Sequence, residues 1–226
     1  MRRWTKRLGF GAGLLLIFAA GIGFLIGFLM LRASLPQTTG SLALPGLERP
    51  VRVIRDAHGI PSILAGSRHD LYMALGFVHA QDRLFQMDLQ RRLGAGRLSE
   101  VFGETAIGSD RFMRTLGLYR HAAASVNAAS AEFRAVLDDY TAGINAFLHN
   151  GTTLPIEFTV LGYRPDDRAP ADSLVIGKTL ELRQSGNYRQ ELQYAGWLTS
   201  FPPTRLETCS QAIPRTRRSR SRNWRH

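Results

Sequence analysis

The sequence predicts a mostly helical α+β protein, and three observations support this fold class. Residues 8–31 form an uncharged apolar run, residues 50–65 are rich in β-branched residues around a turn, and residues 67–198 carry apolar residues at helical spacing. The first predicts an N-terminal membrane helix, the second a short β-hairpin, and the third a series of helices that share a core. At 226 residues the chain can hold one domain of ordinary size.

The net charge of +11 is concentrated at the two ends of the chain. Basic residues exceed acidic ones by four in residues 1–7 and by six from residue 205 on, which leaves +1 on residues 8–204. A nucleic-acid-binding domain would carry its basic excess on the folded body, so we expect no nucleic-acid partner. Binding of nucleic acid or anionic lipid by the C-terminal arginines is the weaker alternative. The single cysteine, Cys209, excludes an intrachain disulfide and a cysteine metal cluster.

Residues 8–31 have the length of a membrane-spanning helix. Four basic residues precede this run and Arg32 follows it, so the positive-inside rule predicts a cytoplasmic N-terminus and an exported body. The run is longer than a usual signal-peptide core, which favours an uncleaved signal anchor in the inner membrane. The alternative is cleavage near Ala33 and secretion. Both place the body in the periplasm or outside the cell.

Composition divides the chain into four segments. Residues 1–33 are a cytoplasmic basic stub with the signal anchor, and residues 34–50, with three prolines and two glycines, are a linker. Residues 51–200 are the body. Residues 201–226 begin with Phe-Pro-Pro and end in an arginine-rich run without apolar periodicity, which predicts a disordered or frameshifted tail rather than a genuine basic one.

The body is expected to begin with a hairpin. VRVIR at 51–55 is one strand, residues 56–59 (Asp-Ala-His-Gly) are the turn, and residues 60–64 return. Because proline cannot donate a hydrogen bond to a sheet, Pro61 indicates an edge or a strand start.

Helices are expected to follow. A long one begins at Ser67 or Asp70, either of which can cap it, and is interrupted at Gly94–Gly96. Ser130 and Asp172 are the caps of two later helices. The further helices are expected at 97–102, 111–127, 130–149, 173–184 and 188–198, and residues 154–170 are expected to be irregular.

The long helix carries an acidic residue in its predicted buried stripe, which consists of Leu71, Leu75, Val78, Phe85 and Leu89. Asp82 falls in the middle of this stripe, where a carboxylate is costly unless it is paired. His79 and Gln86 are within reach on the same face, whereas the neighbouring Arg83 points elsewhere. An ion pair therefore needs an arginine or lysine from another element. A structural role is favoured over a catalytic one.

Two stretches of this region carry a resemblance to a known family. They are PVRVIRDAHGIPSILAGSRHDLYMALGFV at 50–78 and HAQDRLFQMDLQRRLGAGRLSEVFG at 79–103. Both closely resemble the penicillin acylase (penicillin amidase) family, and the resemblance covers about residues 35–198. It rests on several unusual tripeptides that occur in the same order at matching separations.

The resemblance implies an N-terminal-nucleophile hydrolase with an αββα sandwich. In this family a precursor is cut into a smaller α part and a larger β part, which supplies most of the sheet. The first residue of the β part is a serine whose own α-amino group is the base, because a serine hydroxyl alone is a weak nucleophile. The reaction cleaves acyl-amide bonds of penicillins, N-acyl-homoserine lactones or similar substrates.

This chain resembles only the α part, so we expect an incomplete domain of a truncated protein that is inactive alone and has the β part as its partner. The family's nucleophile opens a segment similar to Ser-Asn-Asn-Trp. Ser221-Arg222-Asn223-Trp224 is a faint echo of it, which we interpret as chance. No catalytic residue is therefore assigned to this chain.

The resemblance also implies roles for individual residues of the α part. It places a calcium ligand at Glu191, with the other ligands of this structural ion coming from the β part. It places two acyl-pocket positions at Glu181 and Ser185, whose polarity argues against a phenylacetyl substrate. Arg168 and Ala171 stand where tryptophans are common, which weakens the packing expected for residues 164–172.

A different class of function competes with the enzyme part. The chain has an anchor and amphipathic helices but no assigned nucleophile, so it could be a non-catalytic, membrane-anchored helical module that binds a partner protein. Such a module would fold alone as a monomer or a defined oligomer, whereas a separated α part would aggregate or lack fixed packing.

Overall fold

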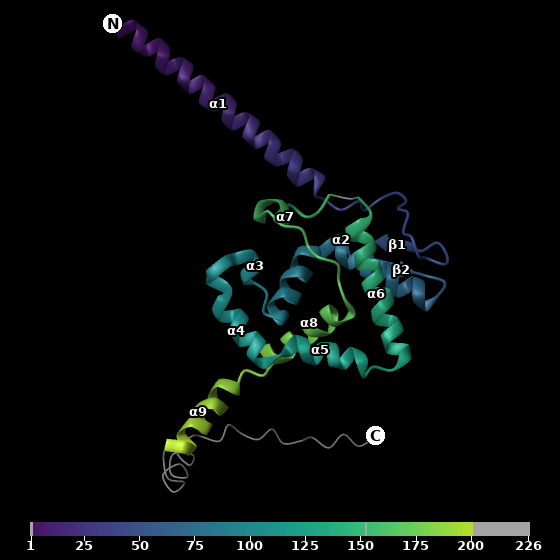
Figure 1. Cartoon of the computed structure of the whole chain (residues 1–226). Helices are drawn as coiled ribbons and strands as arrows, with labels where there is room; N and C mark the ends of the chain where they lie inside the picture. The colour runs from purple at the N-terminus through teal and green to yellow at the C-terminus, as the bar shows by residue number, and fades with distance from the viewer. Residues whose placement is uncertain (1, 152, 201–226) are drawn as a thin grey trace. The chain divides into compact units, whose positions relative to one another are not determined.

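The computed structural model describes residues 2–151 and 153–200, with side chains from residue 18 on except at 188, 189, 198 and 200 (Figure 1). It divides the chain into two units, Met1–Thr179 and Leu180–His226. The described part is mostly helical with one short hairpin, as predicted. Its elements are α1 Arg2–Ala33, β1 Arg52–Arg55, β2 Pro61–Leu64, α2 Arg68–Ala95, α3 Ser99–Phe102, the 3-10 helix η1 Gly103–Ala106, α4 Ile107–Leu116, α5 Leu118–Asn127, α6 Ala131–His149, α7 Ile156–Leu161, α8 Pro170–Gln184 and α9 Tyr188–Ser200.

The apolar run at 8–31 lies within the single helix α1. In the part of the chain that the structure describes, no helix meets the length and apolarity needed to cross a membrane. The side chains of residues 8–17, nearly half of the predicted span, lie outside the described residues. The membrane helix is therefore not confirmed.

The hairpin is confirmed, with β1 and β2 antiparallel and Arg55 opposite Pro61. Asp56 holds the turn, because its Oδ1 accepts from the backbone N–H groups of His58 and Ile60 at 2.8 and 2.9 Å. Gly59 has φ +79°, a conformation that favours glycine. Pro61 begins its strand, as its missing N–H predicted.

Helix α2 begins as predicted but has a different buried face. The Ser67 hydroxyl oxygen caps it by accepting from Asp70 N at 3.1 Å. The helix is kinked at Arg83, which has non-helical φ and ψ of −143° and 23°. Leu71 of the predicted stripe is exposed. As a residue Asp82 is exposed, whereas Asp88 is fully buried. The predicted stripe is wrong in part, because the buried positions Met73, Phe77, Ala80, Leu84 and Asp88 form a stripe on a different face of the helix.

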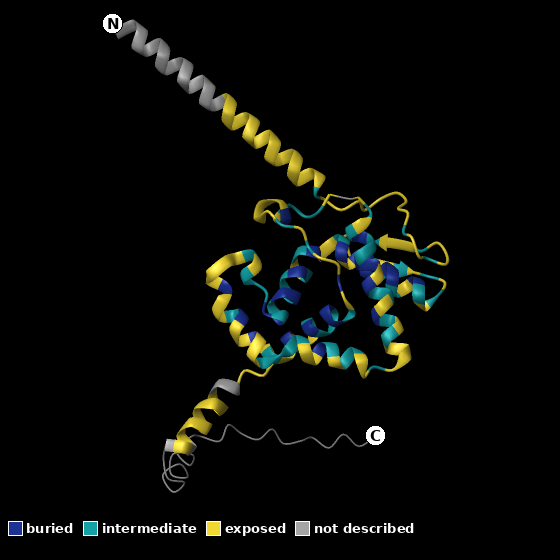
Figure 2. Cartoon of the chain, viewed as in Figure 1, coloured by how far each residue is buried: buried dark blue, intermediate teal, exposed yellow. Residues whose placement is uncertain are grey.

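The main packing unit is the pair α2 and α6 (Figure 1). Their buried side chains form one core cluster that also takes in α7, and Figure 2 shows buried residues gathered along these two helices. The rings of Phe77 and Phe147 meet edge to face with centroids 5.4 Å apart. Further along α2, Gly94 lies against Val175 and Thr179 of α8. The cluster consists of Phe77, Ala80, Leu84, Ile144, Phe147 and Phe158.

The later elements differ from prediction in three places, each for a local reason. The single helix expected at 111–127 is two, since Gly117 with φ +69° ends α4 and donates to Met113 O. Residues 156–161 form α7 within the stretch expected to be irregular, and Gly162 caps it in the left-handed conformation. Helix α8 begins at Pro170, a residue favoured in the first turn, while Asp172 accepts from Ala169 N at 2.9 Å.

Candidate functional site

The three residues assigned by resemblance all lie in the second unit and are exposed. Glu181 is in the last turn of α8, and Ser185 follows this helix. The Ser185 hydroxyl donates to the carbonyl oxygen of Glu181 at 2.9 Å, so the backbone brings these two residues together. Glu191 is in the first turn of α9, where its Oε1 accepts from Asn187 Nδ2 at 2.6 Å. No hydrogen bond found between residues 153 and 200 joins Glu191 to the other two.

The described donor set does not by itself fit a calcium ion. Calcium takes six to eight oxygen ligands, and Glu191 offers one carboxylate. Among residues 2–151 and 153–200, no group of three or more histidine, cysteine, aspartate or glutamate side chains is placed to hold a metal. The predicted calcium site stays a prediction, and the other ligands would have to come from elsewhere.

The cation that Asp82 was expected to need comes from the hairpin. Arg55, the last residue of β1, binds both carboxylate oxygens of Asp82 at 2.8 and 2.9 Å. It also donates to Gln81 Oε1 and Gly59 O, so one guanidinium ties β1, the turn and α2 together. His79 turns instead to the Tyr140 hydroxyl, with Nδ1 at 2.9 Å. This bidentate ion pair engages both carboxylate oxygens of Asp82 in joining the hairpin to α2, which supports a structural role for Asp82.

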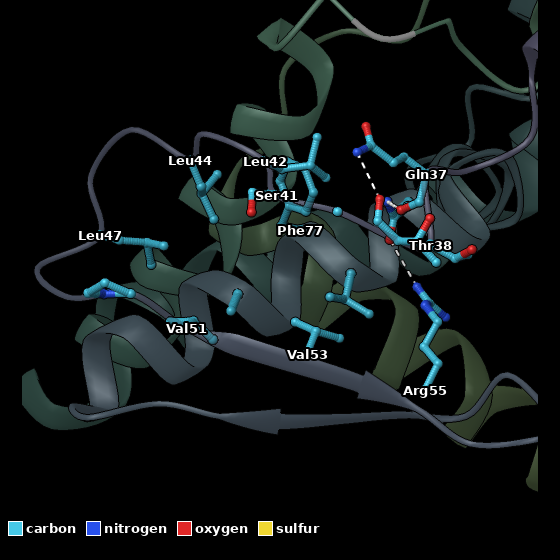
Figure 3. Close-up of a pocket in the computed structure, with 16 residues that line it drawn as sticks. Gln37, Thr38, Ser41, Leu42, Leu44, Leu47, Val51, Val53, Arg55 and Phe77 are labelled. Carbon is cyan, nitrogen blue, oxygen red and sulfur yellow. Dashed lines mark hydrogen bonds between the residues drawn. The ribbon is translucent and has the colours of Figure 1, made fainter.

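A cavity of about 320 Å³ lies between the linker, β1 and α2 (Figure 3). Leucine and valine side chains from the linker and β1 meet Phe77 of α2, while Gln37 and Arg55 lie at its polar end. The Gln81 amide donates to Gln37 O at 2.8 Å and closes this end. The volume suits a small apolar group. Glu181, Ser185 and Glu191 are not among its lining residues, and its arginine is already engaged. Its apolar lining consists of Leu42, Leu44, Leu47, Val51, Val53, Ala74, Phe77 and Val78.

The largest concentration of buried charge was not predicted from the sequence. Asp88 of α2 binds Arg91 Nε at 2.7 Å and Arg92 Nε at 2.8 Å. Arg91 also reaches Asp172 of α8 at 3.2 Å, and the Tyr163 hydroxyl donates to Asp88 Oδ2 at 2.9 Å. The sequence signal is the spacing Asp88-x-x-Arg91-Arg92, which places both cations within one helical turn of the acid.

The electrostatics of this network favour charged groups. Burial alone raises the pKa of Asp88, but hydrogen bonds and charges from Arg92 and Arg91 outweigh it, so its pKa lies below the ordinary value. Burial and the Asp88 carboxylate both raise the pKa of the Tyr163 hydroxyl, which therefore stays protonated and donates. The network joins α2, α8 and the segment before α8, so its role is structural.

Arg168 is buried where packing was expected to be weak. Its backbone N–H and C=O pair with the Asn145 side chain of α6 at 2.8 and 3.0 Å, which fastens residues 164–172 to the core. Within the described chain, none of its three guanidinium nitrogens has a hydrogen-bond partner. Burial and the nearby Arg91 charge lower the pKa of Arg168.

Several of the described serine hydroxyls are used for local structure. Ser67 and Ser130 cap α2 and α6, and Ser99 donates to Asp110 at 2.6 Å. The Ser125 hydroxyl donates to the backbone carbonyl oxygen of His121 at 2.9 Å, and no hydrogen bond found in residues 2–151 and 153–200 joins a serine hydroxyl to a histidine ring. Ser221, in the faint nucleophile-like segment, lies outside the described residues.

Comparison with known proteins decides the family. Residues 50–224, most of the chain, match the family model described as penicillin amidase. The chain belongs to the penicillin amidase family. This range extends beyond residue 198, where we expected the resemblance to end, and it includes all of α2 to α9.

Curated relatives of this penicillin amidase family member carry two kinds of acylase name. Penicillin acylase 2 proenzyme of Pseudomonas sp. strain SE83 is 47% identical over 152 residues, which are 67% of this chain and 20% of that protein. Acyl-homoserine lactone acylase QuiP of Pseudomonas aeruginosa is 39% identical over 160 residues, or 70% of this chain and 19% of QuiP. The chain thus spans about a fifth of the length of the curated relatives it matches, which fits an α part.

A solved structure supports the fold. Thermostable penicillin G acylase from Alcaligenes faecalis matches with a TM-score of 0.61 and 22% identity, covering 78% of this chain and 97% of the matched chain. At this identity the likeness shows the fold alone. The helical arrangement with its short hairpin is therefore a penicillin acylase fold.

Proposed function

We propose that this chain is the α part of an acyl-amide hydrolase whose nucleophilic serine comes from a β part of the same precursor. The observation that carries the proposal is the family match over residues 50–224, in a chain that spans a fifth of relatives named as acylases. One of these relatives is named a proenzyme, a name that fits a chain cut into parts.

Exposed apolar side chains support the need for a second polypeptide. A two-stranded hairpin is marginal alone, and here Val53 and Ile54 of β1 and Leu64 of β2 are 40%, 48% and 56% exposed. In the second unit Leu192 and Trp197 of α9 are 67% and 45% exposed. Single exposed apolar side chains are normal on a protein surface, but several on one short element favour a surface that another polypeptide contacts.

In the proposed complex this chain positions substrate and the β part performs the chemistry. The α-amino group of the β part's first serine would accept the hydroxyl proton, and the hydroxyl would attack the acyl carbon. Glu181 and Ser185 are proposed to line the acyl pocket, where their polarity favours acyl groups that carry a polar substituent over phenylacetyl. Glu191 is proposed to ligate calcium with oxygens of the β part.

The test combines the full chain with the remainder of the Pseudomonas sp. penicillin acylase 2 proenzyme that lies beyond the matched region. Hydrolysis of a penicillin and of an N-acyl-homoserine lactone is measured for each polypeptide and for both together. We expect turnover only with both, and its loss when the first serine of the partner is replaced by alanine. Turnover by this chain alone would overturn the proposal. A stable, well-packed chain that never joins the partner would support the non-catalytic module instead.

We also propose that α1 targets the chain to the membrane and directs the export of the body across it. Phe18 and Phe24 are 69% and 78% exposed, and the basic residues at 2–7 give the segment a direction. The check is a reporter fused after residue 60 that is active only outside the cytoplasm, together with sequencing of the mature N-terminus. A fusion that is made but inactive would contradict export, and the sequencing distinguishes an anchor from a cleaved signal.

A further inference from the structure

A second cavity, of about 190 Å³, is lined by arginine side chains. It lies where the end of α2, the loop after it, α4 and α5 meet α8, away from the cavity of Figure 3. Four guanidinium groups and one carboxylate line this small cavity, so its wall carries more hydrogen-bond donors than acceptors. Its polar lining consists of Arg91, Arg92, Arg97, Arg114, Tyr119 and Asp172.

Two of these arginines are occupied by the protein itself. Arg91 donates to Asp88, to Asp172 and to the carbonyl oxygens of Asp166 and Asp167. Arg92 donates to Asp88 and Glu100. Their side chains are 6% and 5% exposed, so they form a rigid wall of the cavity.

The other two arginines, Arg97 and Arg114, have N–H groups that make no hydrogen bond within the described chain. Arg97 uses Nε and Nη2 on Glu100 and Asp166, and Arg114 uses Nε on Gly96 O at 2.7 Å. Among the hydrogen bonds of the described residues, none involves Nη1 of Arg97 or either terminal nitrogen of Arg114. A guanidinium group has five N–H donors in a fork that matches a carboxylate or phosphate.

Carboxylates offset much of the positive charge around the cavity, because Asp88 and Asp172 pair with Arg91, and Glu100 and Asp166 pair with Arg92 and Arg97. What the cavity offers an anion is therefore the unused N–H donors of Arg97 and Arg114. Arg168, buried and without a hydrogen-bond partner in the described chain, is electrostatically coupled to Arg91 and Asp172 of the wall. Asp172 is already held by Arg91 and by Ala169 N. Asp110, on the same helix as Arg114, turns both oxygens to Leu98 and Ser99 at the start of α3.

We infer that this cavity binds a small oxyanion, a carboxylate or phosphate group, through the free donors of Arg97 and Arg114. The oxyanion is either a free ion or an acidic side chain of the proposed β part, and only the second source rests on the proposed function. Both sources offer two or more acceptor oxygens to the same forks.

Inorganic phosphate is the probe, titrated into the full chain at constant ionic strength with chloride as the competing ion. Binding is measured by calorimetry for the unaltered chain, Arg114→Ala, Arg97→Ala and the control Arg111→Ala, which lies on α4 but does not line the cavity. We expect saturable binding that weakens about tenfold or more in the first two variants and is unchanged in the control. The arginines at 215–225 are present in every variant, so the difference reports the cavity.

Arg114→Lys keeps the positive charge but loses the paired N–H donors of the guanidinium group. Its affinity for phosphate is expected to lie between those of the unaltered chain and Arg114→Ala. Far-ultraviolet circular dichroism checks that each variant is folded. Equal phosphate affinity in Arg114→Ala and Arg111→Ala, or no saturable binding by the unaltered chain, would overturn the inference.

Repeating the phosphate titration with the partner polypeptide bound shows whether the oxyanion is a free ion or an acidic side chain of the partner. Loss of phosphate binding would assign the cavity to an acidic side chain of that partner, and retained binding would assign it to a free oxyanion. If the two polypeptides do not form a complex, the proposed β-part partner is contradicted, but the phosphate titration of this chain alone still tests the oxyanion site. The two proposals can therefore fail separately.

Discussion

Gly76 of α2 and Gly143 of α6 each lie against the backbone of the opposite helix. A Cβ atom added to Gly76 would overlap the carbonyl oxygen of Tyr140, and one added to Gly143 would overlap the carbonyl oxygen of Met73. The two helices therefore pack backbone to backbone at this crossing, closer than side chains allow. The core cluster around Phe77 and Ile144 depends on this approach.

Gly76→Ala and Gly143→Ala are each expected to destabilise the chain by about 1–3 kcal/mol or more, because the colliding atoms are backbone and cannot rotate away. Chemical denaturation of the full chain measures the effect. The matched control is Gly177→Ala in α8, where an added Cβ meets nothing within 4 Å. It should stabilise by about 0.5–1 kcal/mol, since alanine favours helix over glycine. Equal effects at the three positions would contradict the close crossing.

Asp88 and Asp82 provide a second comparison within α2. Asp88→Asn removes the acid from two buried arginines and is expected to cost about 3–5 kcal/mol. Asp82→Asn breaks the Arg55 pair, whose side chains are 14% and 26% exposed, and is expected to cost about 1 kcal/mol or less. Denaturation midpoints of the two variants test the order. A larger loss for Asp82→Asn would show that the hairpin pair, not the buried network, dominates.

His69 links stability to pH. Its Nδ1 lies 2.7 Å from Asp139 Oδ1 and its Nε2 lies 3.0 Å from Gly46 O, so both nitrogens face acceptors and the protonated ring is favoured. The bond to the Gly46 carbonyl, and then Asp139, raise the pKa of His69. The stabilisation is therefore full below the ordinary histidine pKa and is lost as pH rises through the raised value.

Unfolding free energy measured between about pH 5 and about pH 8 should fall with pH more steeply in the unaltered chain than in His69→Asn. His58→Asn, in the exposed hairpin turn, is the control and should keep the steeper slope. Identical slopes for all three chains would show that His69 does not couple folding to protonation.

Trp197 reports on the proposed partner. Its side chain is 45% exposed and its ring meets Tyr194 edge to face, with centroids 5.5 Å apart. If the β part covers α9, tryptophan emission should shift to shorter wavelength when the two polypeptides combine, because the indole loses water. The shift should be absent in Trp197→Phe and present in Trp4→Phe. A shift that survives in Trp197→Phe would place the contact elsewhere.

Local signals account for most of the fold that was predicted. Ser67 and Ser130 cap their helices through their own hydroxyls, and Asp56 and Gly59 make the hairpin turn from within four residues. The break at Gly117 was also a local signal, and it was missed because the apolar pattern continues across it. The assignments of Glu181, Ser185 and Glu191 came from resemblance, and the described contacts do not test them.

The sequence by itself determined the caps, the turn, most helix positions and the family, because each depends on neighbouring residues or on literal motifs. Only the tertiary structure decided which acid of α2 is buried, since it is the packing of the other elements that covers the face with Asp88 and leaves Asp82 to Arg55. It also brought Arg97 and Arg114 to one cavity, a meeting of distant residues that depends on how the helices pack. Burial and ion pairing depend on contacts between residues that are distant in the sequence, and the spacing of apolar residues along the chain does not reveal those contacts.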